Sequence, residues 1–315
     1  MIESDVIIVG GGPAGSTCTW KLKQLGINAT ILDKQQFPRT KLCAGWLTPK
    51  VIKDLKIDIS SYPYSFTSYK KLNVHIHGHR ISLKTTQYAI KRDEFDAWLL
   101  HRLNIPLLHH NVKEIQKEND YFIIDQEFRC RILVGAGGTN CPVYHTFFKN
   151  DSSRPKEKSI ITLESEFPYD IHDHNCYLWF YDNKLPGYSW YVPKNNTLNI
   201  GLGGKLSVLK SRRETIKEHW DYFLDKLEKL SLIENVNIQP KGYQYYLRQK
   251  NINAQKGNVF IVGDAAGLAT LDMGEGIGPA VESGIRAAYA IATGGKLSLK
   301  SIRRYSLFQI IFSKV

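Results

Sequence analysis

A glycine-rich turn near the N-terminus constrains the fold of this chain more than any other feature. The apolar run at residues 5–10 predicts a buried parallel strand, and residues 13–25 carry apolar side chains at a helical spacing. Gly10, Gly12 and Gly15 join the two as G-x-G-x-x-G. In such a turn the first glycine permits the bend, the second lets the backbone approach a pyrophosphate, and the third lets helix and strand pack closely.

The residues that follow the turn complete a dinucleotide-binding β-α-β unit. Pro13 and Ala14 open the helix, whose N-terminus offers positive potential to a phosphate group. Residues 27–33 predict the second strand, which ends at Asp33 and is followed by Lys34, also expected at the cofactor. A carboxylate at that distance from the turn typically binds the ribose hydroxyls. These residues do not distinguish FAD from NAD.

A second glycine-rich segment near the end of the chain favours FAD. The strand predicted at residues 258–262 leads to Gly263 and Asp264, and a further helix is predicted at 278–294. Asp264 can accept hydrogen bonds from the ribityl chain of a flavin. Gly274 and Gly276 let backbone N–H groups face the ring, and a helix beginning near Ile277 would stabilise the negative charge of reduced flavin.

The order of these segments predicts an α/β fold with two domains. A Rossmann-like FAD-binding domain, discontinuous in sequence, is expected at residues 1–66, 88–158 and 255–315. An inserted antiparallel-sheet α+β substrate domain is expected at 67–87 and 159–254, with one charged amphipathic helix over 211–230.

Composition narrows the function classes. The net charge of +12 indicates either a solvated lysine surface or attraction to anionic partners such as phosphates or acidic lipids, and no nucleic-acid-binding motif is present. Five scattered cysteines argue against a disulfide framework or a metal cluster, and we expect no metal.

We expect a cytoplasmic monomer, since no signal peptide or spanning segment is recognised. The C-terminal stretch 298–315 is interpreted either as docking on the protein's own core or as a peripheral membrane contact.

The segment "GYSWYVPK" (187–194) predicts a strand that carries Tyr188 and Trp190 on one face. Pattern alone favours ordinary sheet core. If the inserted sheet covers a flavin, the same face becomes the wall of a substrate chamber. The position of Pro193 and Lys194, ahead of the second cofactor strand, favours the chamber.

Four segments of the chain resemble the geranylgeranyl reductase family of the flavoprotein hydroxylase superfamily. They are "RTKLCAGWLTP" (39–49), "RDEFDAWL" (92–99), "YSWYVPK" (188–194) and "GDAAGLATLDMGEGIGPAVESG" (263–284), in addition to the N-terminal turn. The resemblance implies a lipid-binding cavity beside a flavin, and such families usually continue past the final helix with a segment that covers part of this cavity.

The resemblance also assigns residues to roles. It implies that Lys41, Cys43, Ala44 and Gly45 lie beside the flavin and that Arg92 contacts FAD. It implies further that Tyr188, Trp190 and Pro193 shape the substrate cavity. Cys43 is interpreted either as the proton donor or as a small residue next to the ring, because a thiol can deliver a proton whereas the nearby Lys41 favours a thiolate.

One departure from the superfamily concerns the middle strand. Gly137 is expected at the cofactor, but it stands where hydroxylases carry an acid that assists nicotinamide handling, which weakens the hydroxylase interpretation. We therefore expect an FAD-dependent oxidoreductase that reduces carbon–carbon double bonds of an isoprenoid or other lipid-like substrate, with NAD(P)H or a ferredoxin-type donor. A flavin monooxygenase or halogenase and a non-catalytic flavin-binding protein are the alternatives.

Overall fold

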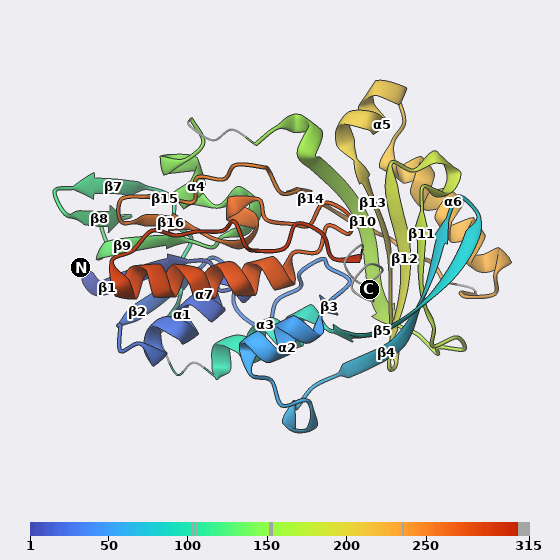
Figure 1. Cartoon of the computed structure of the whole chain (residues 1–315), viewed down its shortest axis with the longest axis horizontal. Coiled ribbons are helices and arrows are strands. Elements are labelled where there is room, and N and C mark those ends of the chain that lie inside the picture. Colours follow the sequence, from blue (N-terminus) through green and yellow to red (C-terminus); the bar gives the residue numbers. More distant parts are fainter. Residues whose placement is uncertain (103, 105, 151–153, 235, 308–315) are drawn as a thin grey trace.

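The computed structural model describes residues 1–102, 104, 106–150, 154–234 and 236–307. Every strand in this part of the chain belongs to one of two sheets (Figure 1). The first sheet lies at the left of Figure 1 with the N-terminus, and the second curls at the right. This arrangement confirms the predicted α/β fold, with a mainly parallel sheet joined to a mainly antiparallel one.

The first sheet has the parallel core expected of a dinucleotide-binding fold. Its order is β15-β16-β9-β1-β2-β6, and β8 pairs with β9 and β7. Residues 6–8 of β1 are fully buried because the strand is covered on both faces, which explains their uninterrupted apolar run. The strands are β1 (Ile2–Val9), β2 (Ala29–Asp33), β6 (Leu107–His109), β7 (Ile115–Glu118), β8 (Tyr121–Ile124), β9 (Phe128–Gly135), β15 (Gln255–Lys256) and β16 (Val259–Ile261).

Two long helices pack against each other beside β1. They are α1 (Pro13–Gln24) and α7 (Ile277–Thr293). They approach closely, since a Cβ atom on Gly284 would lie 2.5 Å from the Ala14 carbonyl oxygen. Cys18 and Leu22 of α1 complete this core. The shorter helices nearby are α2 (Pro49–Leu55), α3 (Arg92–His101) and α4 (Pro142–Phe147).

The second sheet has the order β14-β10-β13-β12-β11-β4-β5-β3. All its pairs are antiparallel except β4 with β11. One face packs against α6 (Ile216–Lys229) through Trp220, Phe223 and Leu227. The strands are β3 (Trp46–Leu47), β4 (Phe66–Ile76), β5 (His79–Ile90), β10 (Ser159–Pro168), β11 (Cys176–Phe180), β12 (Gly187–Lys194), β13 (Thr197–Lys205) and β14 (Lys241–Tyr246).

The helix predicted over 211–230 is confirmed for residues 216–229, but its predicted start is wrong. The structure has α5 (Leu206–Arg212) and α6 (Ile216–Lys229) instead. Arg213 adopts a left-handed conformation, with φ 58°, that ends α5. Thr215 then caps α6, because its hydroxyl accepts from Glu218 N while the Glu218 carboxylate accepts from Thr215 N.

The segment after α7 returns to the core of the first sheet. Leu299 and Ile302 are buried in the same cluster as Leu133 and Val259, as expected if this stretch docks on the protein itself. The rest of the predicted tail, residues 308–315, lies outside the described residues. The predicted domain boundaries stay a prediction. Strand β3, which lies in the range predicted to bind FAD, pairs with β5 of the second sheet.

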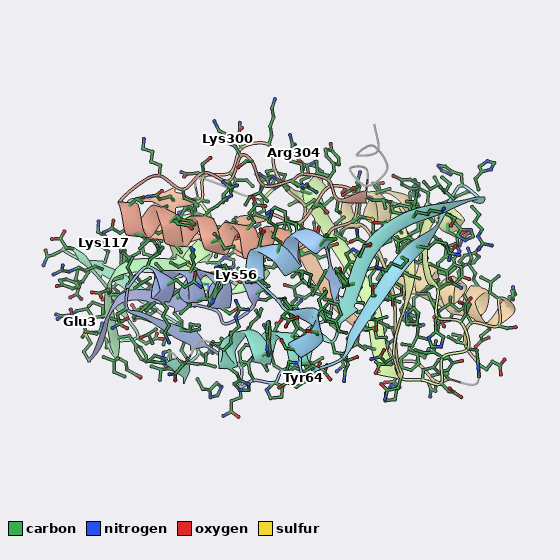
Figure 2. All side chains as sticks on the ribbon, turned by 60° about the horizontal axis from the view of Figure 1, so that its bottom comes forward. Glu3, Lys56, Tyr64, Lys117, Lys300 and Arg304 are labelled. Carbon is green, nitrogen blue, oxygen red and sulfur yellow. The ribbon has the colours of Figure 1, made fainter. Side chains whose placement is uncertain are left out.

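Basic side chains are spread over the molecule. Figure 2 shows Lys117 at one end, Lys56 near the middle, and Lys300 with Arg304 along another edge. No helix within the described residues is long and apolar enough to cross a membrane. Over the same residues, no group of three or more histidine, cysteine or acidic side chains is arranged to hold a metal ion.

Candidate functional site

A cavity of about 1360 Å³ lies between the two sheets. Its lining runs from the Gly10–Gly12 turn of the first sheet to Tyr188 and Trp190 on the second. The wall between them comes from the loop 39–46, the segment 271–277 and strand β10. The cavity therefore joins the predicted cofactor residues to the predicted substrate wall.

The N-terminal end of the cavity is formed by the glycine turn that the sequence predicts to bind a dinucleotide. Gly10 has φ +115°, and a Cβ atom there would lie 2.5 Å from the carbonyl carbon of Ala136. Asp33 Oδ2 accepts a hydrogen bond from Gly11 N at 2.6 Å, so the carboxylate also holds the turn. Gly12 is the N-cap residue of α1, which brings the positive end of the helix dipole to the cavity.

Arg92 is buried and held by a carboxylate. Its Nε and Nη2 donate to the two oxygens of Asp96 at 2.9 and 2.8 Å, and Arg39 Nη2 lies 3.3 Å from Asp96 Oδ2. Burial acts to lower the pKa of Arg92, but Asp96 and Cys43 outweigh it and the pKa is raised. Arg39 and Asp96 were not predicted from the sequence, although the spacing of Arg92 and Asp96 by four residues on a helix was a usable signal.

The loop 41–45 lies beside the cavity and is fixed at both ends. Lys41 Nζ lies 3.2 Å from the centre of the Tyr243 ring. Cys43 Sγ accepts a hydrogen bond from Gly45 N at 3.4 Å. A Cβ atom on Gly45, where φ is +70°, would lie 1.9 Å from the Ile90 carbonyl oxygen, so only glycine allows the loop to pass this strand.

Strand β12 places its alternate side chains as the sequence indicated. Tyr188, Trp190 and Val192 line the cavity, whereas Tyr191 points to the opposite face and packs in the core under α6. The indole of Trp190 lies over Gly201, since a Cβ atom there would be 2.2 Å from its Cζ2. Trp190 Nε1 donates to Asn199 Oδ1 at 2.7 Å.

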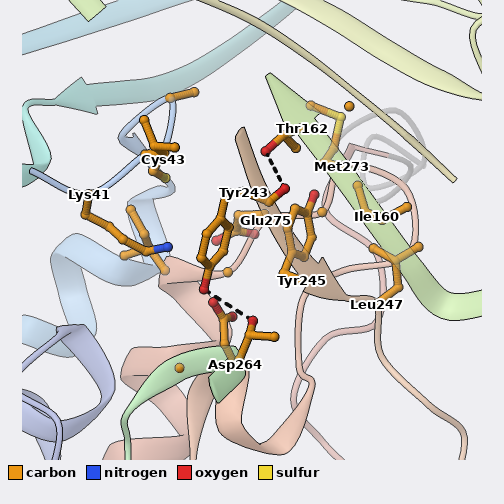
Figure 3. A pocket seen from close by; sticks show the side chains of 18 of the residues that line it. Lys41, Cys43, Ile160, Thr162, Tyr243, Tyr245, Leu247, Asp264, Met273 and Glu275 are labelled. Atoms are coloured by element: carbon orange, nitrogen blue, oxygen red, sulfur yellow. Dashed lines mark hydrogen bonds between the residues drawn. The ribbon is translucent and has the colours of Figure 1, made fainter. Parts of the chain in front are cut away.

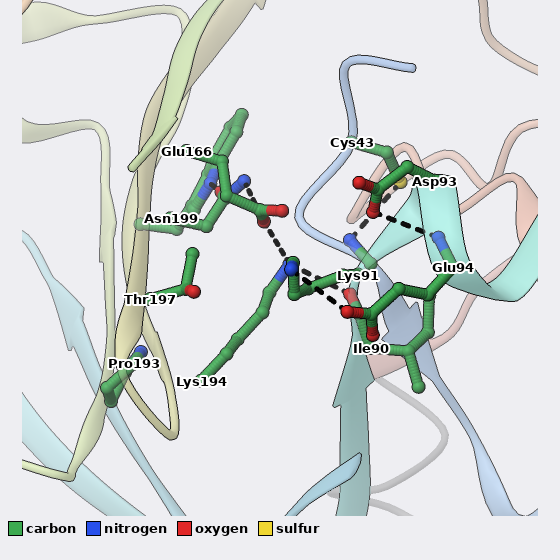
Figure 4. A network of polar contacts seen from close by, with 12 residues as sticks. Cys43, Ile90, Lys91, Asp93, Glu94, Glu166, Pro193, Lys194, Thr197 and Asn199 are labelled. Carbon is green, nitrogen blue, oxygen red and sulfur yellow. Dashed lines mark hydrogen bonds and ion pairs between the residues drawn. The ribbon is translucent and has the colours of Figure 1, made fainter. Parts of the chain in front are cut away.

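Lys194 explains why the aromatic strand ends in Pro-Lys. Its side chain is fully buried, its Nζ donates to the Ile90 carbonyl oxygen at 2.9 Å, and it pairs with Glu166 (Figure 4). Asn199 Nδ2 also donates to Glu166, at 3.0 Å. Ile90 N donates to Gly45 O, so Lys194 connects the aromatic strand to the loop that carries Cys43.

Two tyrosines of β14 enter the cavity and were missed from the sequence. Figure 3 shows the rings of Tyr243 and Tyr245 between Lys41 and Ile160. The Tyr245 hydroxyl occupies the space beside Gly274, where a Cβ atom would be only 2.0 Å away. Their i, i+2 spacing was a signal, but nothing local shows which face of an edge strand meets the cavity.

Two carboxyl groups line the same cavity. Burial raises the pKa of Glu164 on β10 to about 7, against opposing interactions with Lys194 and the Cys43 backbone. Burial also raises the pKa of Glu275 to about 7, although Gly278 N donates to it at 3.0 Å. Both groups therefore retain a substantial protonated fraction at neutral pH. Neither carboxyl group was predicted from the sequence.

Most of the predicted site residues line this cavity. Those that do are Gly10, Gly12, Pro13, Ala14, Asp33, Lys34, Lys41, Cys43, Ala44, Arg92, Gly137, Tyr188, Trp190, Asp264, Gly274, Gly276 and Ile277. Four do not: Gly15, Gly45, Gly263 and Pro193. Gly15 and Gly45 support the cavity through backbone contacts, and Pro193 instead accepts a hydrogen bond from the Tyr69 hydroxyl through its carbonyl oxygen.

The residues present fit a flavin dinucleotide. The glycine cradle and the start of α1 suit the pyrophosphate, and Asp264 and Gly276 line the same cavity farther along. The start of α7 at Ile277 also reaches it, with Gly276 as the N-cap residue. Tyr245 lies against Gly274, so an isoalloxazine ring beside Gly274 would contact or displace this tyrosine.

Sequence comparisons identify relatives along nearly the whole chain. An uncharacterized protein of Methanosarcina barkeri is 34% identical over 314 residues, covering 94% of this chain and 76% of that protein. A geranylgeranyl diphosphate reductase of Rhodobacter capsulatus is 24% identical and covers 92% and 75%, respectively. The family described as lycopene cyclase protein matches residues 5–151.

Solved structures share the fold at lower identity. A geranylgeranyl bacteriochlorophyll reductase-like protein from Thermoplasma acidophilum has a TM-score of 0.78 and 21% identity, covering 99% of this chain and 82% of that one. The flavin-dependent brominase Bmp2 has a TM-score of 0.73 and 18% identity, with coverage of 97% and 82%. The fold is therefore common to reductase-like and halogenase structures.

Proposed function

Since the chain belongs to the geranylgeranyl reductase-like family of FAD flavoproteins, we propose that it is an FAD-dependent oxidoreductase that reduces carbon–carbon double bonds of an isoprenoid or another lipid-like substrate. The observation that carries the proposal is the apolar wall opposite the glycine turn, within one cavity. This wall comprises Leu178, Phe180, Tyr188, Trp190 and Val192.

The wall suits a substrate that offers few polar groups. An isoprenoid chain can be held by area and shape, and flat aromatic side chains align it without hydrogen bonds. The phenol of Tyr188 is already engaged, since it donates to the Met273 carbonyl oxygen at 2.6 Å. Burial also raises its pKa, so it stays neutral and adds no charge to the wall.

Basic side chains at another part of the lining suit an anionic head group. Lys184, Lys205 and Arg212 all line the cavity, near the start and end of α5 and the turn before β12. Helix α5 lies at the upper right of Figure 1, away from the N-terminal strand β1. An amphipathic lipid with a phosphate or carboxylate head could be held there while its apolar chain lies along the aromatic wall.

When bound and reduced, FAD would supply a hydride to one carbon of the double bond. The residues of this chain would bind and orient the alkene, exclude water and supply the proton for the other carbon. Cys43, which lines the cavity, or solvent could deliver that proton. We propose NAD(P)H or a ferredoxin-type protein as the electron donor.

A flavin-dependent monooxygenase or halogenase is the second candidate. The fold shared with a brominase and with the halogenase CmlS, at a TM-score of 0.74, supports it. The segment "GYSWYVP" also resembles the W-x-W-x-I-P motif of flavin halogenases, with Tyr188 in place of the first tryptophan. This candidate requires oxygen for product formation, which the reductase does not.

The deciding experiment is anaerobic incubation of the dithionite-reduced, FAD-loaded protein with a panel of prenyl lipids. The reductase proposal expects flavin reoxidation and a saturated product without oxygen. Trp190→Phe should slow flavin reoxidation. Trp220→Phe should not, because Trp220 belongs to α6 and packs on the opposite face of the second sheet. Product only in oxygen would favour the second candidate. Protein that binds FAD but is reoxidised by no lipid would indicate a non-catalytic flavoprotein.

A further inference from the structure

We propose that Glu164 is the proton donor to the second alkene carbon, a role that rests on the proposed reductase function. No sequence motif indicated this residue. It becomes a candidate because β10 brings its carboxyl group into the chamber lined by Trp190 and Cys43.

The strand geometry directs Glu164 into the cavity. Ile160, Thr162 and Glu164 alternate along β10, and all three line it. Glu164 pairs across the sheet with Gly201, which also pairs with Trp190 on the other side. A Cβ atom on Gly201 would lie 2.8 Å from Glu164 Cβ as well as close to the indole, so the missing side chain lets Trp190 and Glu164 pack together.

Glu164 is buried without a salt-bridge partner among the described residues. It is only 5% exposed. Lys194 acts on it from β12 and Lys41 from the cavity loop, but Lys194 is bound to Glu166 and Ile90, and Lys41 lies on the Tyr243 ring.

Burial leaves the Glu164 carboxyl group substantially protonated at neutral pH, and its other neighbours do not reverse this effect. Glu166 on the same strand and Tyr245 on β14 also act on Glu164, and the Cys43 backbone donates to it. Burial prevails and raises the pKa of Glu164 to about 7, the range in which a general acid works best at neutral pH.

The proton step balances with the hydride supplied by reduced FAD. The π bond breaks as the hydride forms one C–H bond. Its electron pair forms the second C–H bond with the proton of the Glu164 carboxyl group, which becomes a carboxylate. The external donor proposed above would then restore the reduced cofactor. Glu164 recovers its proton from solvent as product leaves.

The other candidates are less well disposed. Cys43 Sγ already accepts a hydrogen bond from Gly45 N and interacts with Arg92. Glu275 accepts from Gly278 N at the start of α7, whereas Glu164 meets the Trp190 wall at Gly201. Tyr245 has its pKa raised far above neutrality by burial, which makes it a poor acid.

The test compares Glu164→Gln with Cys43→Ser and Glu275→Gln, and Glu118→Gln on exposed β7 serves as the unchanged control. FAD binding is measured first by quenching of flavin fluorescence. Anaerobic reoxidation by the best prenyl lipid then reports the reaction. Infrared difference spectra over a pH titration, recorded without lipid, report each protonated carboxyl group independently of activity.

The proposal expects Glu164→Gln to bind FAD but to slow reoxidation by about 10²–10⁴-fold. It should also remove one carboxylic acid band that titrates near neutral pH. Glu164→Ala should recover part of the rate with added formate, which a merely structural role would not allow. The proposal is overturned if Glu164→Gln is reoxidised at the wild-type rate. It is also overturned if a rate loss of this size appears only in Cys43→Ser or Glu275→Gln. If the wild type binds FAD but no lipid reoxidises it, the proposed function fails, and the inference with it.

Discussion

Replacing Glu166 by glutamine should destabilise the protein more than replacing its partner Lys194 by methionine. The reason is the difference in their exposure: the Lys194 side chain is 0% exposed and that of Glu166 is 25% exposed. Glu166→Gln leaves the buried ammonium with neutral acceptors only, such as the Ile90 carbonyl oxygen, and removing the anionic partner of a buried charge costs about 3–5 kcal/mol.

The reverse substitution leaves a carboxylate that water can reach. In Lys194→Met, Glu166 still accepts from Asn199 Nδ2 at 3.0 Å. The loss is then that of a charged hydrogen bond, about 1.5–3 kcal/mol. The double variant has no stranded charge, so it should be more stable than Glu166→Gln alone.

Urea unfolding of the wild type, the two single variants and the double variant measures the coupling between Lys194 and Glu166. The double variant should depart from additivity by about 2 kcal/mol, well beyond the ~0.5 kcal/mol expected for independent sites. The reasoning is refuted if Glu166→Gln is no more destabilising than Lys194→Met, or if the two effects simply add. FAD affinity should fall in both single variants, because Lys194 holds Ile90 beside Gly45.

Three other predictions concern the cavity. Gly10→Ala should abolish FAD binding, measured by fluorescence quenching, because its Cβ would lie 2.5 Å from Ala136 at φ +115°. Gly274→Ala should weaken FAD binding, and Tyr245→Phe in the same chain should recover part of it, since the clash at 2.0 Å is with the Tyr245 hydroxyl; no recovery would contradict this contact. Burial raises the pKa of Glu164 from 4.5 to about 7 in the folded protein. As the pH rises between these values, the unfolded chain releases the Glu164 proton while the folded protein keeps it, so the free energy of unfolding falls. Measured by urea unfolding, the wild type should lose about 3 kcal/mol of unfolding free energy over that pH range relative to Glu164→Gln. If the unfolding free energies of the two proteins change in parallel with pH, the raised pKa of Glu164 is contradicted.

The sequence predicted the parts of the fold that depend on local patterns. The turn at Gly10 to Gly15 is local, because a strand end, a tight bend and a helix start are all set within a few residues. The division between α5 and α6 was also readable, since Thr215 and Glu218 form the T-x-x-E signature of a capping box. The apolar and charged periodicity across 211–230 obscured it.

The site was predictable only where a residue's neighbours in sequence set its environment. Glu164 looks like an ordinary charged residue in an alternating strand, and its burial arises from Gly201 and Trp190, which follow much later in the chain. Tyr245 likewise meets Gly274 through a contact between distant segments. Pro193 was assigned to the cavity by motif, but the alternation of β12 turns it away from the face shared by Trp190 and Val192.

The same alternation gives the aromatic strand its two functions. Residues 188, 190, 192 and 194 share one face of β12, so the side chains that form the chamber wall are followed on that face by Lys194. Lys194 reaches Ile90, whose N–H donates to Gly45 in the loop that carries Cys43. A shift of β12 by one residue would turn both the aromatic wall and the lysine away from the cavity. The buried ion pair of Lys194 with Glu166 therefore favours the register that sets the wall against the cofactor loop.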